Sequence, residues 1–336
     1  MDVPLSMEKV EANRNFANKL WNTARFITMG LGKLDPTARA SLAVTAPMEA
    51  EELASLPLPE RWVVSRCHTL VRTVTEQLTN NDFGPAGQAI YSFLWDDYAD
   101  WYIEISKKRI GGDDVIAQQQ AQRTLVYVLD SCLRLLHPFM PFITEEVWQR
   151  LPHEGPSLMI ADWPQRDDEP LCVDADAEQR FGSLQALVRS VRNARAEYRV
   201  EPGKLIAATV IAGELEPTLA AETEAITSLA RIDPAAFSFQ GADAEGADGA
   251  VVRLVVEDSL EAVLPLAGLV DSDKERVRLG KQQTKLEASI AKVSKRLEAP
   301  GFVDKAPPAV LEKARTELAE QEEQLQGVLD ALKQLP

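Results

Sequence analysis

The feature that most constrains the fold is an apolar repeat of three and four residues that runs from about residue 7 to residue 150. Successive residues of an α-helix turn by about 100°, so apolar side chains at this spacing share one helical face. The repeat is interrupted at four places, by Pro57 and Pro59, Asn80 and Asn81, Gly111 and Gly112, and Pro138 and Pro141. Helices with such short connections lie antiparallel to their neighbours, so this region predicts a helix bundle.

The pattern changes after the bundle. Residues 166–179 are acidic and lack periodicity, which predicts a linker. A helix over 181–199, the β-rich run KLIAATVIAG, a helix over 217–231 and the β-rich run GAVVRLVVED follow. Together they predict a small mixed α/β unit that ends near LPLAGLVD.

Heptads dominate the chain from about residue 271. The first arm carries Leu279, Leu286, Ile290, Val293 and Leu297, and the second carries Leu311, Leu318, Leu325 and Leu332. Two heptad arms separated by APGFVDKAPP predict an antiparallel coiled coil, with Gln283 and Gln321 at seam positions that help to set its register. We therefore expect a mainly α chain: a bundle over 1–165, a linker over 166–179, an α/β unit over 180–268 and a coiled-coil hairpin over 269–336.

Composition excludes several classes of protein. The chain is 45% apolar, as in ordinary globular proteins, and no apolar run reaches the roughly 18 to 20 residues of a membrane span. No signal-like segment opens it. Its cysteines, Cys67, Cys132 and Cys172, form no CxxC pair and only three histidines accompany them, which argues against a zinc site or a disulfide framework. We expect a cytoplasmic protein.

The net charge of -16 argues against nucleic acid as a partner, because phosphate neutralisation normally supplies much of the affinity. The acidic residues, however, concentrate in MEAEE, DDEPLCVDADAE and GADAEGADG, and basic residues cluster elsewhere. The distribution of charge therefore matters more than its sum.

One helix has an unusual polar face. In RNFANKLWNTARF, residues 14–26, three asparagines and an arginine oppose the apolar stripe, and Phe26 projects beside them. Asparagine is a poor helix former, so an ordinary solvated face would carry Glu, Lys or Gln instead. Amides, a guanidinium and a ring suit the reading of unstacked bases. Taken alone, however, this helix favours the alternative that these side chains cap and pack against neighbouring helices.

Motifs of enzymes are largely missing. The sequence contains no GxGxxG, GxxxxGK[ST], HExxH or GxSxG, and KVSKR at 292–296 lies inside the heptads. The carboxylates of WDDYADWYIE are interleaved with aromatic residues, which favours a packed helix with polar anchors over acid and base chemistry. His137, before Pro138, is typical of a hydrogen-bonded histidine at a helix break.

Two basic features remain. Arg189, Arg192, Arg195 and Arg199 lie at spacings of three and four, a stripe suited to phosphate unless Glu197 and Glu201 pair with it. The first heptad arm is basic and the second acidic, a pattern compatible with pairing between the arms or with contact to a polyanion.

RNFANKLWNTARF, RWVVSR, FGPAGQAIYSFLWDDYADWYIEISKKRI and LLHPFMPFITEEVWQRL resemble, in this order, the anticodon-binding helical domain of class I aminoacyl-tRNA synthetases for aliphatic amino acids. The tail from LPLAGLVD onward, including FVDKAP, resembles the C-terminal coiled coil of the valyl-tRNA synthetase family. The resemblance covers practically the whole chain. It does not include that family's nucleotide-binding catalytic domain or editing domain, and MDVPLSMEKV resembles the interior of a longer protein.

The resemblance implies that the chain binds valine tRNA but does not activate valine by itself. We expect a monomer, because a hairpin formed within one chain needs no partner. ATP and magnesium are expected only for the catalytic half, supplied in cis or in trans. The first helix is expected to receive the anticodon, with Asn15, Asn22, Arg25 and Phe26 on its bases and with Arg14 and Lys19 on backbone phosphate. The outer corner of the tRNA is expected to meet Arg189, Arg192, Lys281, Lys285, Lys292, Lys295 and Arg296, by charge and shape.

Two other hypotheses stay open from the sequence. One is a stand-alone, non-catalytic paralogue whose bundle and coiled coil bind another RNA or a protein. The other is an independent enzyme that uses the carboxylates around Asp97.

Overall fold

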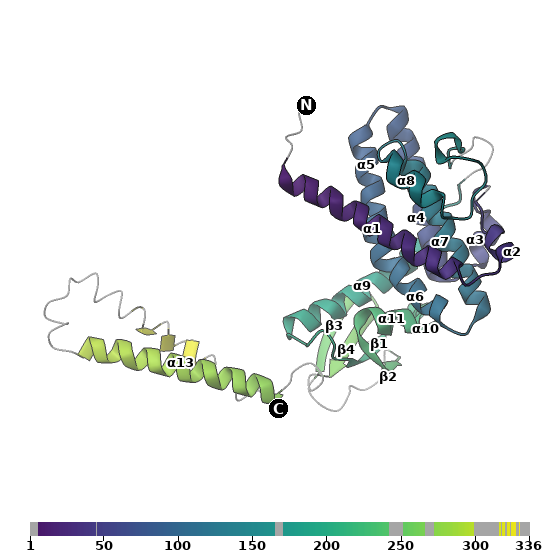
Figure 1. The fold of residues 1–336 in the computed structure, drawn as a ribbon. Coiled ribbons are helices and arrows are strands. Elements are labelled where there is room, and N and C mark those ends of the chain that lie inside the picture. Colours follow the sequence, from purple (N-terminus) through teal and green to yellow (C-terminus); the bar gives the residue numbers. More distant parts are fainter. Residues whose placement is uncertain are drawn as a thin grey trace.

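A computed structural model describes residues 6–44, 46–164, 171–241, 251–265 and 272–298, and residues 316, 318–319, 321–322, 324–326 and 329 of the second heptad arm. The molecule consists of a helical bundle, a small α/β unit beneath it and a long helix that lies apart from both (Figure 1). No helix in the described ranges is long and apolar enough to cross a membrane.

The bundle contains the helices that the apolar repeat predicts. They are α1 (Met7–Leu31), α2 (Pro36–Ala40), α3 (Ala50–Ser55), α4 (Leu58–Thr79), α5 (Phe83–Ser92), η1 (Phe93–Tyr102), α6 (Ile103–Gly111), α7 (Val115–Leu136) and α8 (Pro141–Trp148), with a 3-10 turn η2 at Leu158–Ile160. The expected breaks are confirmed: Pro59 and Pro141 lie in first turns, Asn80 caps α4 and α6 ends at Gly111. Proline is tolerated there because first-turn amides have no intrahelical partner.

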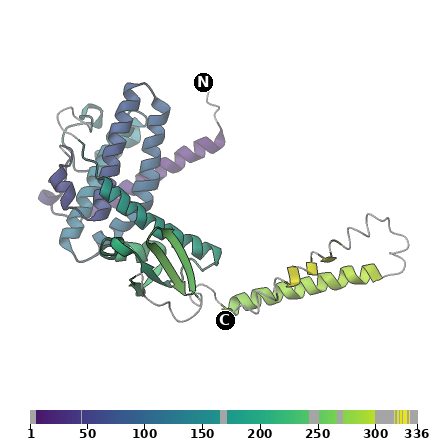
Figure 2. The ribbon, with the colours of Figure 1, turned by 180° about the vertical axis from the view of Figure 1, so that it is seen from behind.

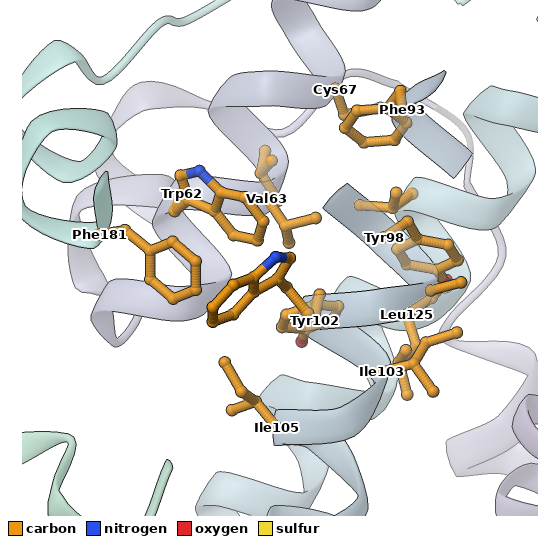
Figure 3. Packing of buried hydrophobic residues seen from close by; sticks show 14 of the residues in the cluster. Trp62, Val63, Cys67, Phe93, Tyr98, Tyr102, Ile103, Ile105, Leu125 and Phe181 are labelled. Atoms are coloured by element: carbon orange, nitrogen blue, oxygen red, sulfur yellow. The ribbon is translucent and has the colours of Figure 1, made fainter. Parts of the chain in front are cut away.

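The π-helix η1 was not predicted. Its wider turn brings side chains four and five positions apart onto one face, so Phe93 stacks over Tyr98 and Tyr98 over Tyr102, with ring centroids 6.5 and 6.2 Å apart. Tyr98 and Tyr102 are fully buried in the core between α4 and α7 (Figure 3). The aspartates between these rings are consequently directed to the two sides of η1.

Helix α9 (Ala175–Glu197) joins the bundle to the α/β unit. Its Phe181 stacks on Trp62 of α4 at a centroid distance of 3.9 Å (Figure 3). The helix begins six residues before the predicted start, inside the stretch predicted as a linker, because the Asp174 carboxylate caps it by accepting from the Ala177 amide.

The α/β unit has one sheet of four strands, in the order β2-β1-β4-β3. The strands are β1 (Ile206–Ile211), β2 (Ile232–Phe239), β3 (Val251–Glu257) and β4 (Leu260–Pro265). β1 and β2 are parallel and are connected through α10 (Glu216–Ala221) and α11 (Thr223–Ala230); the other pairs are antiparallel. The predicted helix over 217–231 is thus two helices, with Glu222 between them.

Helix α13 (Ser272–Glu298) is the first predicted coiled-coil arm and projects away from the α/β unit in both views (Figures 1 and 2). Its seam residues Leu286, Ile290, Val293 and Leu297 are half-buried, as are Leu318 and Leu325 of the second arm, whose described residues are helical. The turn APGFVDKAPP, Leu311 and Leu332 lie outside the described residues.

Candidate nucleic-acid interface

The first helix presents its polar face because its apolar stripe is anchored in the core. Phe16, Leu20, Ala24, Ile27 and Leu31 are all 5% exposed or less. The residues that oppose this stripe, namely Arg14, Asn15, Asn18, Asn22 and Arg25, are exposed, as the helical period predicts. The Ser6 side chain begins the helix by accepting from the Lys9 amide.

This polar face forms one wall of a groove, and η1 and α6 form the other. The volume of the groove is about 420 Å³. Its lining residues are Asn15, Asn18, Lys19, Asn22, Thr23 and Phe26 on one side and Ala99, Asp100, Ile103, Glu104 and Lys107 on the other. Four of the six predicted anticodon residues therefore meet in one place.

The lysines of this α1 groove are engaged by protein partners. Lys19 Nζ lies 2.5 Å from Asp100 Oδ1 and 4.0 Å from the centre of the Trp95 ring. Lys107 Nζ lies 2.6 Å from Glu104 Oε1. Lys19 was expected to be available for backbone phosphate. In the structure its ammonium group forms an ion pair with Asp100 instead. Neutral amides with balanced charges favour recognition of base edges over general attraction of phosphate.

Two further predicted residues of α1 differ in exposure. Arg25 is exposed, and no ion pair joins it to any residue that the structure describes. Phe26, expected as an exposed ring, is half-buried against the core while it lines the groove. A ring held in this way presents only part of its surface for stacking.

Sequence reasoning missed the wall formed by Asp100, Glu104 and Lys107. A signal was present, because these residues recur at spacings of four and three and so share one helical face. Their neighbours Trp101 and Ile105 are buried. The pairing of this face with α1 is tertiary and could not be read from either helix alone.

The arginine stripe of α9 is only half as long as predicted. Arg195 is 7% exposed and donates to the backbone carbonyls of Arg231 and Glu201, at 3.2 and 3.1 Å, so its role is structural. Arg199 follows the end of the helix with a left-handed φ of 53°. Neither residue therefore contributes to the basic stripe: Arg195 is buried, and Arg199 lies beyond the end of α9.

Arg189 and Arg192 remain exposed, and both guanidinium groups lie over the Trp101 ring, 5.5 and 5.6 Å from its centre. Burial lowers the pKa of Arg192, and the nearby Asp100 and Glu104 carboxylates oppose this effect. The same two carboxylates line the α1 groove. The predicted corner-binding arginines therefore lie beside the predicted anticodon site.

The lysines of α13 form a second, separate basic surface. Lys281, Lys285, Lys292 and Lys295 are exposed. At about 100° per residue, the mean direction of these four lysines around the helix axis lies roughly 140° from the mean direction of the half-buried seam residues. Lysines on that side cannot pair with an arm packed on the seam, which disfavours pairing between the arms as their role. The side chain of Arg296 lies outside what is described.

Other candidates from the sequence have structural partners. Asp97 pairs with Arg66 of α4 at 3.1 Å. His137 caps α7 and its Nδ1 is 2.8 Å from Thr144 Oγ1, which confirms a hydrogen-bonded histidine at a helix break. Within the described ranges no group of three metal-ligating side chains comes together.

Comparison with known families matches two regions of the chain. Residues 60–211 match the anticodon-binding domain of tRNA ligases, and residues 271–336 match the valyl tRNA synthetase tRNA-binding arm. The first region includes η1, α6 and α9, and the second includes the α13 lysines.

Relatives align with nearly the whole chain. It is 41% identical to the chloroplastic/mitochondrial valine-tRNA ligase 2 of Arabidopsis thaliana over 96% of its length. It is 38% identical to the valine-tRNA ligase of Syntrophotalea carbinolica over 99%, and 36% identical to that of Bacillus subtilis over 94%. It spans 33%, 36% and 34% of these relatives, which is about a third of their length.

Proposed function

We propose that this chain, which belongs to the valyl-tRNA synthetase family as its C-terminal anticodon-binding domain and tRNA-binding arm, binds valine tRNA at two surfaces. The α1 groove receives the anticodon. The lysine face of α13 contacts the outer corner of the same molecule. The observation that carries the proposal is the difference in charge between these surfaces: lysines are paired inside the groove and exposed on the arm.

In the groove, the amides of Asn15 and Asn22 supply both donors and acceptors to base edges. Arg25, which has no ion-pair partner among the described residues, adds a charged donor at the rim. Phe26 stacks with the part of its ring that lines the groove. Lys19 becomes available to phosphate when RNA displaces Asp100. Arg14 lies five residues before it on α1, where it pairs with Glu11 at 3.6 Å, and it adds a second phosphate contact.

Arg189 and Arg192 supply phosphate contacts next to the groove. Their guanidinium groups are held over Trp101, which limits the side-chain freedom that binding has to remove. We therefore assign these two arginines to the backbone of the anticodon arm and not to the outer corner.

On the arm, Lys281 and Lys295 are separated by 14 residues, or about 21 Å along the helix axis at 1.5 Å per residue. A basic edge of this length contacts several consecutive phosphates and carries little base information. Arg296 continues the same face by its position in the sequence.

In this proposal the chain is the tRNA-binding third of a cytoplasmic enzyme that attaches valine to its tRNA. The remaining part of that enzyme supplies ATP and magnesium binding and the chemistry. The hairpin of the arm is intramolecular, so binding needs one copy of the chain.

Titration of binding against salt, with unmodified valine tRNA and with the same tRNA carrying a replaced anticodon, tests the proposal. We expect tighter binding of the valine anticodon at every salt concentration, and weakening of both complexes as salt rises. Equal binding of the two RNAs would refute anticodon reading by the groove. Absence of a salt dependence would refute the role of the arm.

A further inference from the structure

A buried ionic cluster lies where the bundle meets the α/β unit. It consists of Glu60 in the first turn of α4, Arg109 in the last turn of α6, and Glu222 between α10 and α11. Arg109 Nη1 lies 2.7 Å from Glu60 Oε2, and its Nη2 lies 3.0 and 3.2 Å from the two oxygens of Glu222. One guanidinium thus links two bundle helices to the helical layer of the α/β unit.

The cluster is shielded from water. Glu60 is 0% exposed and Glu222 is 5% exposed. The hydroxyl of Tyr102, from η1, donates to Glu60 Oε1 at 3.3 Å. Within the part of the chain that the structure describes, Arg109 is the one cation that pairs with either carboxylate.

The charges of the cluster do not balance. Two ionised carboxylates and one guanidinium leave a net negative charge in a buried place, which is costly because little water solvates it. Uptake of one proton makes the cluster neutral and keeps both contacts of Arg109.

Burial raises the pKa of Glu60 to about 7, Arg109 opposes the rise and Glu222 adds to it. Burial also raises the pKa of Glu222. A carboxyl whose folded-state pKa is raised stabilises the fold below its unfolded value of 4.5, and this contribution is lost as pH rises through about 7.

We propose that Glu60, Arg109 and Glu222 form a proton-linked joint that holds the α/β unit firmly against the bundle when one carboxyl is protonated and loosens when both are ionised. The joint acts at the contact between α6 and α11.

Amide hydrogen exchange in α11, at pH 6 and at pH 8.5, tests the joint without RNA, so the result is independent of the proposed function. After correction for intrinsic exchange, we expect the opening equilibrium of Thr223–Ala230 to rise about tenfold at pH 8.5, which is the linkage effect of one carboxyl with a folded pKa near 7.

Glu60→Gln keeps an oxygen for Arg109 and removes the titration, so its α11 amides should show no such step. Glu146→Gln is the matched control, because Glu146 pairs with Arg150 at an exposed site on α8. It should retain the step. Absence of the step in the wild type, or its persistence in Glu60→Gln, would overturn the proposal.

Discussion

The α1 groove and the α13 arm use basic residues in opposite ways. In the groove, Lys19 and Lys107 are paired with Asp100 and Glu104, so little unpaired positive charge is left to attract phosphate. On the arm, Lys281 and its neighbours are exposed on the face away from the seam. In the proposed function, this placement lets a chain with a net charge of -16 bind a polyanion: the arm attracts the RNA, and the groove discriminates between anticodons.

Removal of the arm's charge should have the largest effect. With Lys281, Lys285, Lys292 and Lys295 all changed to Gln, we expect a loss of affinity of about 10³-fold at 0.1 M salt, because each lost phosphate contact removes about 0.7 to 0.9 from the salt slope. Fluorescence anisotropy over a salt series measures both quantities. The loss should be the same for valine tRNA and for the tRNA with a replaced anticodon.

Glu287→Gln is the control for this variant, since Glu287 bonds to Gln283 and lies away from the lysine face. It should leave the salt slope unchanged. A loss confined to the valine anticodon would contradict the division of labour between the two surfaces.

The groove can be disrupted without touching the arm. Leu20 is 3% exposed in the stripe that anchors α1, so Leu20→Ala should lower the free energy of unfolding of the bundle by about 2–5 kcal/mol. Denaturant unfolding measures this loss. Val10→Ala, at an exposed position of the same helix, should change stability by less than about 0.5 kcal/mol.

In binding assays, Leu20→Ala should abolish the anticodon preference and retain the salt slope that the arm provides. Retention of the preference would show that the anticodon is read elsewhere than on α1.

The sequence predicts most of the bundle because its signals are local. Prolines, Asn80 and Gly111 delimit helices through backbone chemistry, and the stripe from Phe16 to Leu31 has one helical period. The sheet is harder to predict, since β2 contains Pro234 and β4 is a short apolar run. The π-helix was missed because apolar residues at spacings of three to five fit both kinds of helix.

The candidate site shows the same limit. The exposed side of α1 follows from periodicity, whereas its pairing with Asp100 is a tertiary contact across 81 positions. Arg195 donates to the Arg231 carbonyl in the turn after α11, and nothing in the sequence of α9 indicates this contact. Local pattern thus predicts which residues share a face, and it does not predict what that face meets.

A single-residue test of the anticodon site is Arg25→Ala. We expect valine tRNA to bind about ten- to thirtyfold more weakly, because a charged hydrogen bond to a base contributes about 1.5–2 kcal/mol. The tRNA with a replaced anticodon should lose much less. Equal loss for both RNAs, measured by competition binding, would reassign Arg25 to phosphate. Arg180→Ala, which removes an exposed partner of Asp176 on α9, should affect neither.

The smallest expected effect is the most informative about the groove. Asp100→Asn leaves Lys19 without its carboxylate, so phosphate attraction should increase and both RNAs should bind about two- to fivefold more tightly, as for a partly exposed ion pair. The ratio between the two RNAs should fall, because the added attraction is independent of sequence. Asp97→Asn, on the side of η1 that faces Arg66, should leave that ratio unchanged. If Asp100→Asn instead weakens valine tRNA alone, then Asp100 accepts a hydrogen bond from an anticodon base and is itself part of the reading surface.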